Sequence, residues 1–238
     1  MFSDVDAILI QRITAAPIER DPFPHCIIDN IFPDEFYEAL LEQWPAADLF
    51  GSQANTGRVT SGAYKERMVF EFAPERLARL DDARRDFWRQ VLHMLLDFRL
   101  NRSILDKFHD DIASRFFPQE IPTEAIGDSR LISDRIGYAI GPHTDAPSRL
   151  VSLLFYLPTD SRLKHRGTSL YRPIVANFRS DDGRHHPFHL FHRIRTVDFV
   201  PNRLLMFPKT DRSFHGVERI EDLGTVRRLL SYNIHRAA

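Results

Sequence analysis

The stretch "GPHTDAPSRLVSLLFYLP", residues 141–158, decides how the second half of this chain folds. Its last ten residues form a mainly apolar run that ends in a proline, which is typical of a buried β-strand. His143 and Asp145 precede this run and lie two residues apart, a spacing that places both side chains on one face of an extended segment. An imidazole and a carboxylate side by side are half of a metal site. The alternative is a turn in which Asp145 caps the backbone and His143 is simply polar.

The composition is that of an ordinary globular protein. The 238 residues are 43% hydrophobic and 27% charged, and a chain of this length can bury one sizeable core. We therefore expect a single domain over residues 1–238. The formal net charge of −1 gives no basic excess, so neither nucleic acid nor an anionic membrane surface is expected as a partner. Cys26 is the only cysteine, which excludes a disulfide within the chain and favours a buried apolar role for this side chain.

No segment of the sequence reaches the ~20 apolar residues that a membrane span requires. The opening residues, "MFSDVDAILIQRITAAPIERDPFP", do not have the basic region and long apolar run of a secretion signal. We therefore expect a cytoplasmic protein that has no membrane contact. Nothing in the pattern indicates an oligomeric state.

The pattern of the chain changes at about residue 130. Residues 1–129 are mainly helical, because 33–44 and 74–116 combine good helix formers with apolar residues at helical spacing. Between them, residues 51–62 form a polar loop that contains glycine, leads toward a short strand and could cover a site.

Residues 130–238 are a series of short apolar segments bounded by Pro, Gly, Asp or Asn. This pattern predicts an antiparallel sandwich or barrel, with the earlier helices covering one outer face. The expected strands are "RIGYAIG" (135–141), "RLVSLLFYLP" (149–158), "TSLYRP" (168–173), "RTVDFVP" (195–201), "NRLLMFP" (202–208) and "RRLLSYNIH" (227–235).

One insertion, residues 174–195, interrupts the series of strands and is rich in histidine. It contains His185, His186, His189 and His192. A zinc or nickel site built from these four side chains would make the protein a metal-binding module. The insertion has no cysteine to support such a site.

A third ligand for the His143 and Asp145 pair is His215, which follows segment 202–208 after a short turn. Two histidines and one carboxylate on adjacent strands suit ferrous iron, because they leave three coordination positions open. Arg227 and Arg228 begin the next expected strand, where a guanidinium could bind a carboxylate in a bidentate pair. Strand alternation sends these two arginines to opposite faces, so only one can point into a barrel.

Four segments, "GYAIGPHTDAPSRLVSLLFYLP", "GTSLYRP", "KTDRSFHGVERI" and "RRLLSYNIH", together resemble the non-haem iron(II)- and 2-oxoglutarate-dependent dioxygenases, in particular their bacterial prolyl-hydroxylase-like branch. The segment "PFPHCIIDNIFPDEFYEALLEQWP" is also similar to the opening of bacterial members. The resemblance implies a double-stranded β-helix, that is, a jelly-roll or cupin-like barrel with helices packed on its outer face. It also implies that His143, Asp145 and His215 bind Fe(II).

The same resemblance implies the co-substrates and their binding residues. The enzyme would use O2 and 2-oxoglutarate and release succinate and CO2, and ascorbate could support turnover. Arg227 would bind the far carboxylate of 2-oxoglutarate, with Arg228 as the alternative one residue along the strand. Tyr138 would lie near the co-substrate unless it is a core residue.

For the substrate, the resemblance gives only an analogy. We expect a small molecule, either sugar-linked or a natural product, and Arg149 and Arg172 at the pocket mouth would favour a polar or anionic one. The alternatives are a hydroxylase that acts on a protein side chain, a histidine-rich metal-binding module without oxygenase activity, and a barrel that serves only as a binding scaffold.

Overall fold

Residues 149–156 of the apolar run form a central strand of a large antiparallel sheet. The computed structural model describes residues 4–55, 64–116, 125–159 and 162–237. In order across the larger sheet lie β1 (Cys26–Ile28), β9 (Arg203–Pro208), β6 (Arg149–Tyr156), β11 (Arg227–Arg236), β4 (Ala125–Asp134), β3 (Arg67–Glu71) and β2 (Gly51–Ser52).

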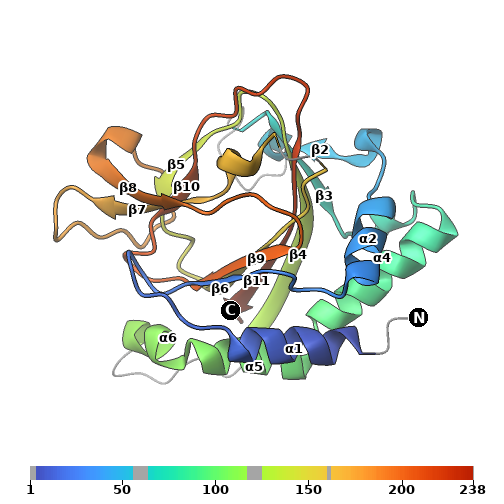
Figure 1. Cartoon of the computed structure of the whole chain (residues 1–238), viewed down its shortest axis with the longest axis horizontal. Coiled ribbons are helices and arrows are strands. Elements are labelled where there is room, and N and C mark those ends of the chain that lie inside the picture. The colour runs from blue at the N-terminus through green and yellow to red at the C-terminus, as the bar shows by residue number, and fades with distance from the viewer. Residues whose placement is uncertain (1–3, 56–63, 117–124, 160–161, 238) are drawn as a thin grey trace.

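A smaller antiparallel sheet faces the larger one. Its order is β5 (Ile140–His143), β10 (His215–Val217), β7 (Ser169–Pro173) and β8 (Phe191–Thr196). Figure 1 shows the smaller sheet above the larger one, with helices below the larger sheet and others at its right-hand side. Two facing antiparallel sheets with helices outside confirm the predicted jelly-roll architecture.

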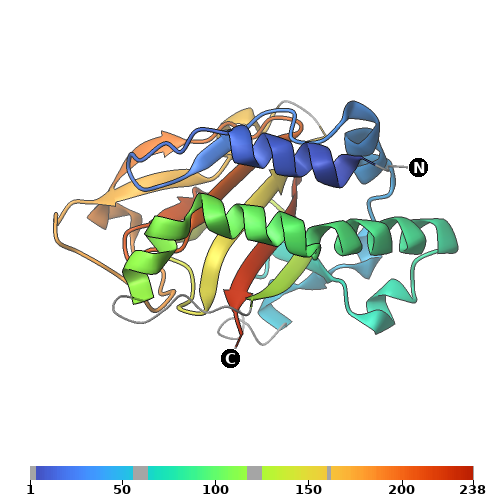
Figure 2. The same cartoon turned by 90° about the horizontal axis from the view of Figure 1, so that it is seen from below.

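The helices are α1 (Val5–Ala15), α2 (Asp34–Glu42), α3 (Pro74–Leu77), α4 (Asp82–Leu95), α5 (Phe98–Lys107) and α6 (His109–Phe116). Figure 2 shows α1 and α5 side by side across the outer face of the larger sheet. The expected helical stretch 74–116 is divided where Asp81 and Asp97 accept hydrogen bonds from the backbone N–H groups of Arg84 and Arg99, 2.9 Å and 2.7 Å away. These aspartates are N-caps, which start new helices. The sequence patterns did not predict α1.

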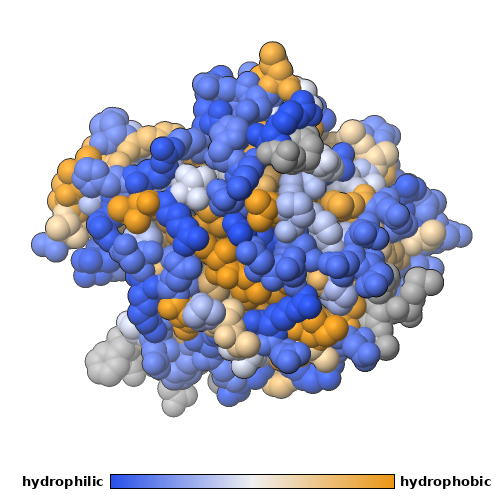
Figure 3. All heavy atoms as spheres, in the orientation of Figure 1, coloured by the Kyte–Doolittle hydropathy of each residue, from blue (hydrophilic) through white to orange (hydrophobic). Residues whose placement is uncertain are grey.

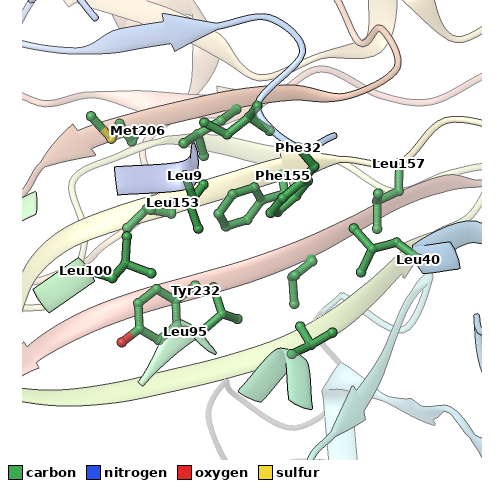
Figure 4. Packing of buried hydrophobic residues seen from close by; sticks show 14 of the residues in the cluster. Leu9, Phe32, Leu40, Leu95, Leu100, Leu153, Phe155, Leu157, Met206 and Tyr232 are labelled. Carbon is green, nitrogen blue, oxygen red and sulfur yellow. The ribbon is translucent and has the colours of Figure 1, made fainter. Parts of the chain in front are cut away.

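The main apolar core lies between the helices and the larger sheet. Leu9 of α1, Leu95 of α4 and Leu100 of α5 are fully buried in the same cluster as Leu153 and Phe155 of β6, and Figure 4 shows these side chains meeting. Burial of each such side chain stabilises the fold by roughly 1.5–3 kcal/mol. The core therefore attaches the helical layer to the sheet.

Strand β11 has one apolar face and one that is largely polar. Leu230, Tyr232 and Ile234 belong to the core under the helices, whereas Arg227 and Ser231 line a cavity between the two sheets. This division follows from the alternation of side chains along a strand. The helical side of the sheet carries much of the stability, and the opposite side is available for chemistry.

Two expected strands are displaced from their predicted positions. Residues 135–139 form the turn between β4 and β5, where Gly137 has φ +89° and its N–H donates to the Ile220 carbonyl at 2.8 Å. Strand β8 ends at Thr196, so 197–201 lies outside the sheets. The N-terminal part also supplies β1, β2 and β3 to the larger sheet. In the expected covering loop, Gly51–Ser52 is β2 and Gln53–Asn55 a 3-10 turn, while residues 56–62 lie outside the described ranges.

Within the described ranges, no helix is long and apolar enough to cross a membrane. Figure 3 shows a largely hydrophilic face, with hydrophobic side chains visible in limited areas, chiefly near its centre. The cytoplasmic location expected from the sequence stays a prediction.

Candidate metal centre

The three predicted ligands meet at one end of the smaller sheet. Strand β5 ends at His143 and β10 begins at His215, and the register pairs these two residues directly. Asp145 follows β5 by two residues. One ligand atom from each of the three side chains lies within 4.8 Å of the others, and no second such group of His, Cys, Asp or Glu occurs among the described residues.

Both histidines are held in the tautomer that leaves Nε2 free to bind a metal. Nδ1 of His143 lies 2.9 Å from the Gly141 carbonyl, and Nδ1 of His215 lies 3.0 Å from the Ser213 carbonyl. A carbonyl oxygen only accepts hydrogen bonds, so each Nδ1 carries the proton and each Nε2 keeps a free lone pair. Burial lowers the pKa of both rings, most strongly for His143, and therefore favours neutral imidazoles.

The carboxylate of Asp145 is oriented by two neighbours. The hydroxyl of Ser152 donates to Oδ2 at 2.6 Å, and Nη1 of Arg149 donates to Oδ1 at 2.5 Å. Burial by itself would raise the pKa of Asp145, but the positive charge of Arg149 and the hydrogen bond from Ser152 oppose this effect, and the pKa is lowered. Asp145 is therefore ionised at neutral pH, so the centre offers one anionic and two neutral ligands, a set that suits a divalent cation with open positions.

The metal centre opens into a cavity of about 540 Å³ between the two sheets. Among the described residues, apolar side chains of its wall include Ile132, Ile140, Val217 and Leu229, and polar ones include Gln53, Arg130, Thr168, Ser231 and Asn233. Sequence patterns did not indicate that these residues share one cavity, since they come from strands and loops far apart in the chain.

A row of charged residues crosses three neighbouring strands at another part of the cavity. Asp134 of β4 pairs in register with Arg67 of β3 and with Arg227 of β11. Arg67 donates from Nε at 2.6 Å and from Nη2 at 2.9 Å to Asp134, and Arg227 donates from Nη1 at 2.8 Å. Arg227 also donates to the Arg166 carbonyl at 2.9 Å and to the Thr168 hydroxyl at 3.1 Å. Asp134 is completely buried, and Arg227 nearly so.

The structure separates Arg227 from Arg228. Arg228 points to the opposite face of β11, where its guanidinium lies over the ring of Trp44 at 5.3 Å, and it does not line the cavity. Arg228 is half-buried on the helical side, because α2 and the residues after it cover this end of the sheet.

Tyr138 lies in the cavity wall and beneath Arg67. The Arg67 guanidinium carbon lies 4.2 Å from the centre of the tyrosine ring, and the buried phenolic hydroxyl has no hydrogen-bond partner in the described part of the chain. Arg149 lines the cavity as expected. The prediction for Arg172 is wrong: this side chain is exposed and paired with Asp21, because it lies on the outer side of β7.

The four histidines of the insertion do not form a metal site. His185 lies in the cavity wall, where the centre of its ring is 4.5 Å from the centre of the His143 ring and its Nδ1 hydrogen-bonds to the Tyr64 hydroxyl. Burial lowers the pKa of His185 to about 4. His186 packs against Phe178, 5.1 Å between ring centres. The other two, His189 and His192, are exposed. The insertion instead serves as a wall of the predicted iron site, a role that the sequence did not indicate.

Buried contacts attach the insertion to residues 142–145, the segment that carries the ligands His143 and Asp145. The backbone N–H of His186 donates to the Pro142 carbonyl at 2.9 Å. The hydroxyl of Thr144 donates to the Ser180 carbonyl at 2.8 Å, and the fully buried ammonium of Lys209 binds both Thr144 and Asp181. These contacts fix the backbone between His143 and Asp145.

The fold and the ligand set define a double-stranded β-helix with a two-histidine, one-carboxylate centre inside the barrel. No protein-family model matches the chain, and a comparison with curated proteins gives no match. Solved structures do resemble it over nearly its full length.

One is a prolyl hydroxylase from Trichoplax adhaerens in complex with a hypoxia-inducible-factor peptide, with a TM-score of 0.54, 13% identity and coverage of 97% of this chain and 89% of that one. Another is a Pseudomonas putida prolyl-4-hydroxylase, with a TM-score of 0.53, 14% identity and coverage of 98% and 99%. A third is HygX from Streptomyces hygroscopicus with nickel and 2-oxoglutarate bound, with a TM-score of 0.50, 10% identity and coverage of 90% and 83%. At such identities the comparison establishes a shared fold.

Proposed function

We propose that this protein is an Fe(II)- and 2-oxoglutarate-dependent oxygenase that oxidises a C–H bond of a small polar molecule. The observation that carries the proposal is the convergence of His143, Asp145 and His215 at a cavity that also contains the buried guanidinium of Arg227. A metal ligand face and a cation for a carboxylate are thus present in one enclosed space.

The residues fit ferrous iron. Two neutral imidazoles with free Nε2 atoms and an ionised carboxylate form the ligand set that leaves three positions open. Iron bound there would supply the redox chemistry that couples O2 and 2-oxoglutarate to oxidation of the substrate, with succinate and CO2 as co-products. The chain's own contribution is to orient Asp145 through Ser152 and Arg149 and to exclude bulk water from the ligands.

The cavity also fits 2-oxoglutarate, which has a carboxylate at each end and methylene groups between. Arg227 offers a guanidinium to the far carboxylate, and the apolar side chains of Ile132 and Leu229 form the next row of the sheet. The unpartnered hydroxyl of Tyr138 is a buried donor that a ligand oxygen would satisfy. The neighbour with nickel and 2-oxoglutarate bound supports the same assignment.

For the substrate we favour a small polar molecule. The cavity volume lies in the range of small-molecule sites, and Ser231 and Asn233 place polar groups on its wall. The buried Oδ1 of Asn233 accepts no hydrogen bond in the described part of the chain. The second candidate is a protein side chain, because one structural neighbour is a prolyl hydroxylase in complex with a peptide.

The test is turnover of 2-oxoglutarate without a known substrate. Purified protein with Fe(II), ascorbate, O2 and 2-oxoglutarate should form succinate slowly, and a panel of polar metabolites and proline-containing peptides should reveal the substrate as an acceleration. His143→Ala should abolish metal binding and succinate formation, whereas His192→Ala, an exposed histidine of the insertion, should retain both. Metal binding without any succinate across the whole panel would contradict the oxygenase and favour a binding scaffold.

A further inference from the structure

The charges around Asp134 do not balance. Two guanidinium groups, those of Arg67 and Arg227, share the single carboxylate of Asp134, so these three side chains carry a net charge of +1, and no second carboxylate pairs with either arginine within the described ranges. The side chains of Asp134 and Arg227 are 0% and 1% exposed, and that of Arg67 is 17% exposed. A net charge is costly at such burial unless a counter-ion is present at least part of the time.

The surroundings favour an anionic ligand for this charge. Arg67 and Arg227 both line the cavity, and Arg67 uses only Nε and Nη2 on Asp134, so within the described residues its Nη1 donates no hydrogen bond. The ring of Tyr138 supports the face of Arg67, and the unpartnered tyrosine hydroxyl lies in the same wall. Donors outnumber acceptors here, as expected of a carboxylate site.

We propose that Arg67 is a second binding residue for the far carboxylate of the co-substrate, and that Asp134 sets the affinity by neutralising one of the two arginines. This inference rests on the proposed function and adds a specificity rule to it. Arg227 and Asp134 together are electrically neutral, so Arg227 supplies a hydrogen-bonding contact to the carboxylate but this pair adds no net charge. With Arg67 the row regains a single positive charge, which favours 2-oxo acids with a second carboxylate over 2-oxo monoacids.

The rule follows from charge counting across the row. The wild type carries +1, Arg67→Gln carries 0, and Asp134→Asn carries +2. A carboxylate is attracted to a guanidinium more strongly in a partly buried site than in water, because the effective dielectric constant is lower there. We therefore expect Arg67→Gln to weaken 2-oxoglutarate binding by at least about tenfold, equivalent to ~1.4 kcal/mol, and Asp134→Asn to strengthen it.

The experiment compares two ligands on nickel-loaded protein by isothermal titration calorimetry. The ligands are 2-oxoglutarate and 2-oxopentanoate, which has the same carbon chain but no far carboxylate. Arg67→Gln should lose affinity for 2-oxoglutarate and keep its affinity for 2-oxopentanoate. Arg172→Gln, an exposed arginine that is ion-paired with Asp21, is the matched control and should change neither.

A purely structural role for Arg67 predicts a different result. In that case Arg67→Gln would lower the melting temperature and reduce the affinity for both ligands by the same factor. Alternatively, it would leave the affinity for 2-oxoglutarate within about threefold of that of the wild type. Either outcome overturns the inference. Should Asp134→Asn fail to fold, Arg67→Lys decides the charge rule: it keeps +1 and should retain most of the preference for 2-oxoglutarate. If the wild type binds neither ligand, the proposed function fails together with the inference. Tight wild-type binding with an unaffected Arg67→Gln overturns the inference alone.

Discussion

Replacement of Arg227 or Arg228 by alanine should separate co-substrate binding from stability. Arg227 is buried in the cavity and could give a carboxylate a charge-assisted hydrogen-bonded contact, which we value at about 2–4 kcal/mol. Arg227→Ala should therefore raise the dissociation constant of 2-oxoglutarate by about 30- to 1000-fold. The variant should still fold, because both oxygens of Asp134 keep their hydrogen bonds from Arg67.

Arg228→Ala should give the opposite pattern. Its guanidinium lies over Trp44 on the helical side of β11, so its loss should cost about 0.5–1 kcal/mol of unfolding free energy and change 2-oxoglutarate affinity by less than about threefold. The assays are calorimetric titration of nickel-loaded protein and urea unfolding of both variants. A larger loss of affinity in Arg228→Ala would refute the assigned strand faces, and equally small losses in both would remove 2-oxoglutarate from this strand.

Three further perturbations test other parts of the structure. Ser152→Ala removes the 2.6 Å hydrogen bond to Asp145 and should weaken nickel binding, measured by competition with a chelator, by about 10- to 100-fold. The far-ultraviolet circular dichroism of the variant should not change. An unchanged nickel affinity would show that Asp145 needs no such support. Burial raises the pKa of Cys26 to about 11, so a disulfide reagent at pH 8 should modify this thiol only after unfolding, and rapid labelling of the folded protein would contradict the burial. The free energy of unfolding should fall as pH rises above about 8.5, because the thiol of the unfolded chain ionises before that of the folded protein. Tyr232→Phe loses the 2.6 Å hydrogen bond to Asn101 and should lower the free energy of unfolding by about 1–2 kcal/mol in urea titrations, without any effect on metal binding.

The sequence alone determined the parts of this protein that depend on local periodicity. Alternation along an extended chain places His143 and Asp145 together and sends Arg227 and Arg228 to opposite faces, because successive strand side chains point in opposite directions. The strand at 227–235 could be predicted for the same reason, and the structure places it at 227–236. The helices at 33–44 and within 74–116 followed from helical spacing of apolar residues.

Only the tertiary structure decided which distant side chains meet. Arg67, Asp134 and Arg227 form one row because β3, β4 and β11 are hydrogen-bonded in a particular register, and register depends on the packing of whole sheets rather than on any local pattern. Tertiary packing likewise placed His185 in the cavity wall and His186 against Phe178, and it left Arg172 outside the cavity although its strand was predicted. Local sequence determines which way a side chain points from its own strand, whereas the packing of the two sheets and the helical layer determines what that side chain contacts.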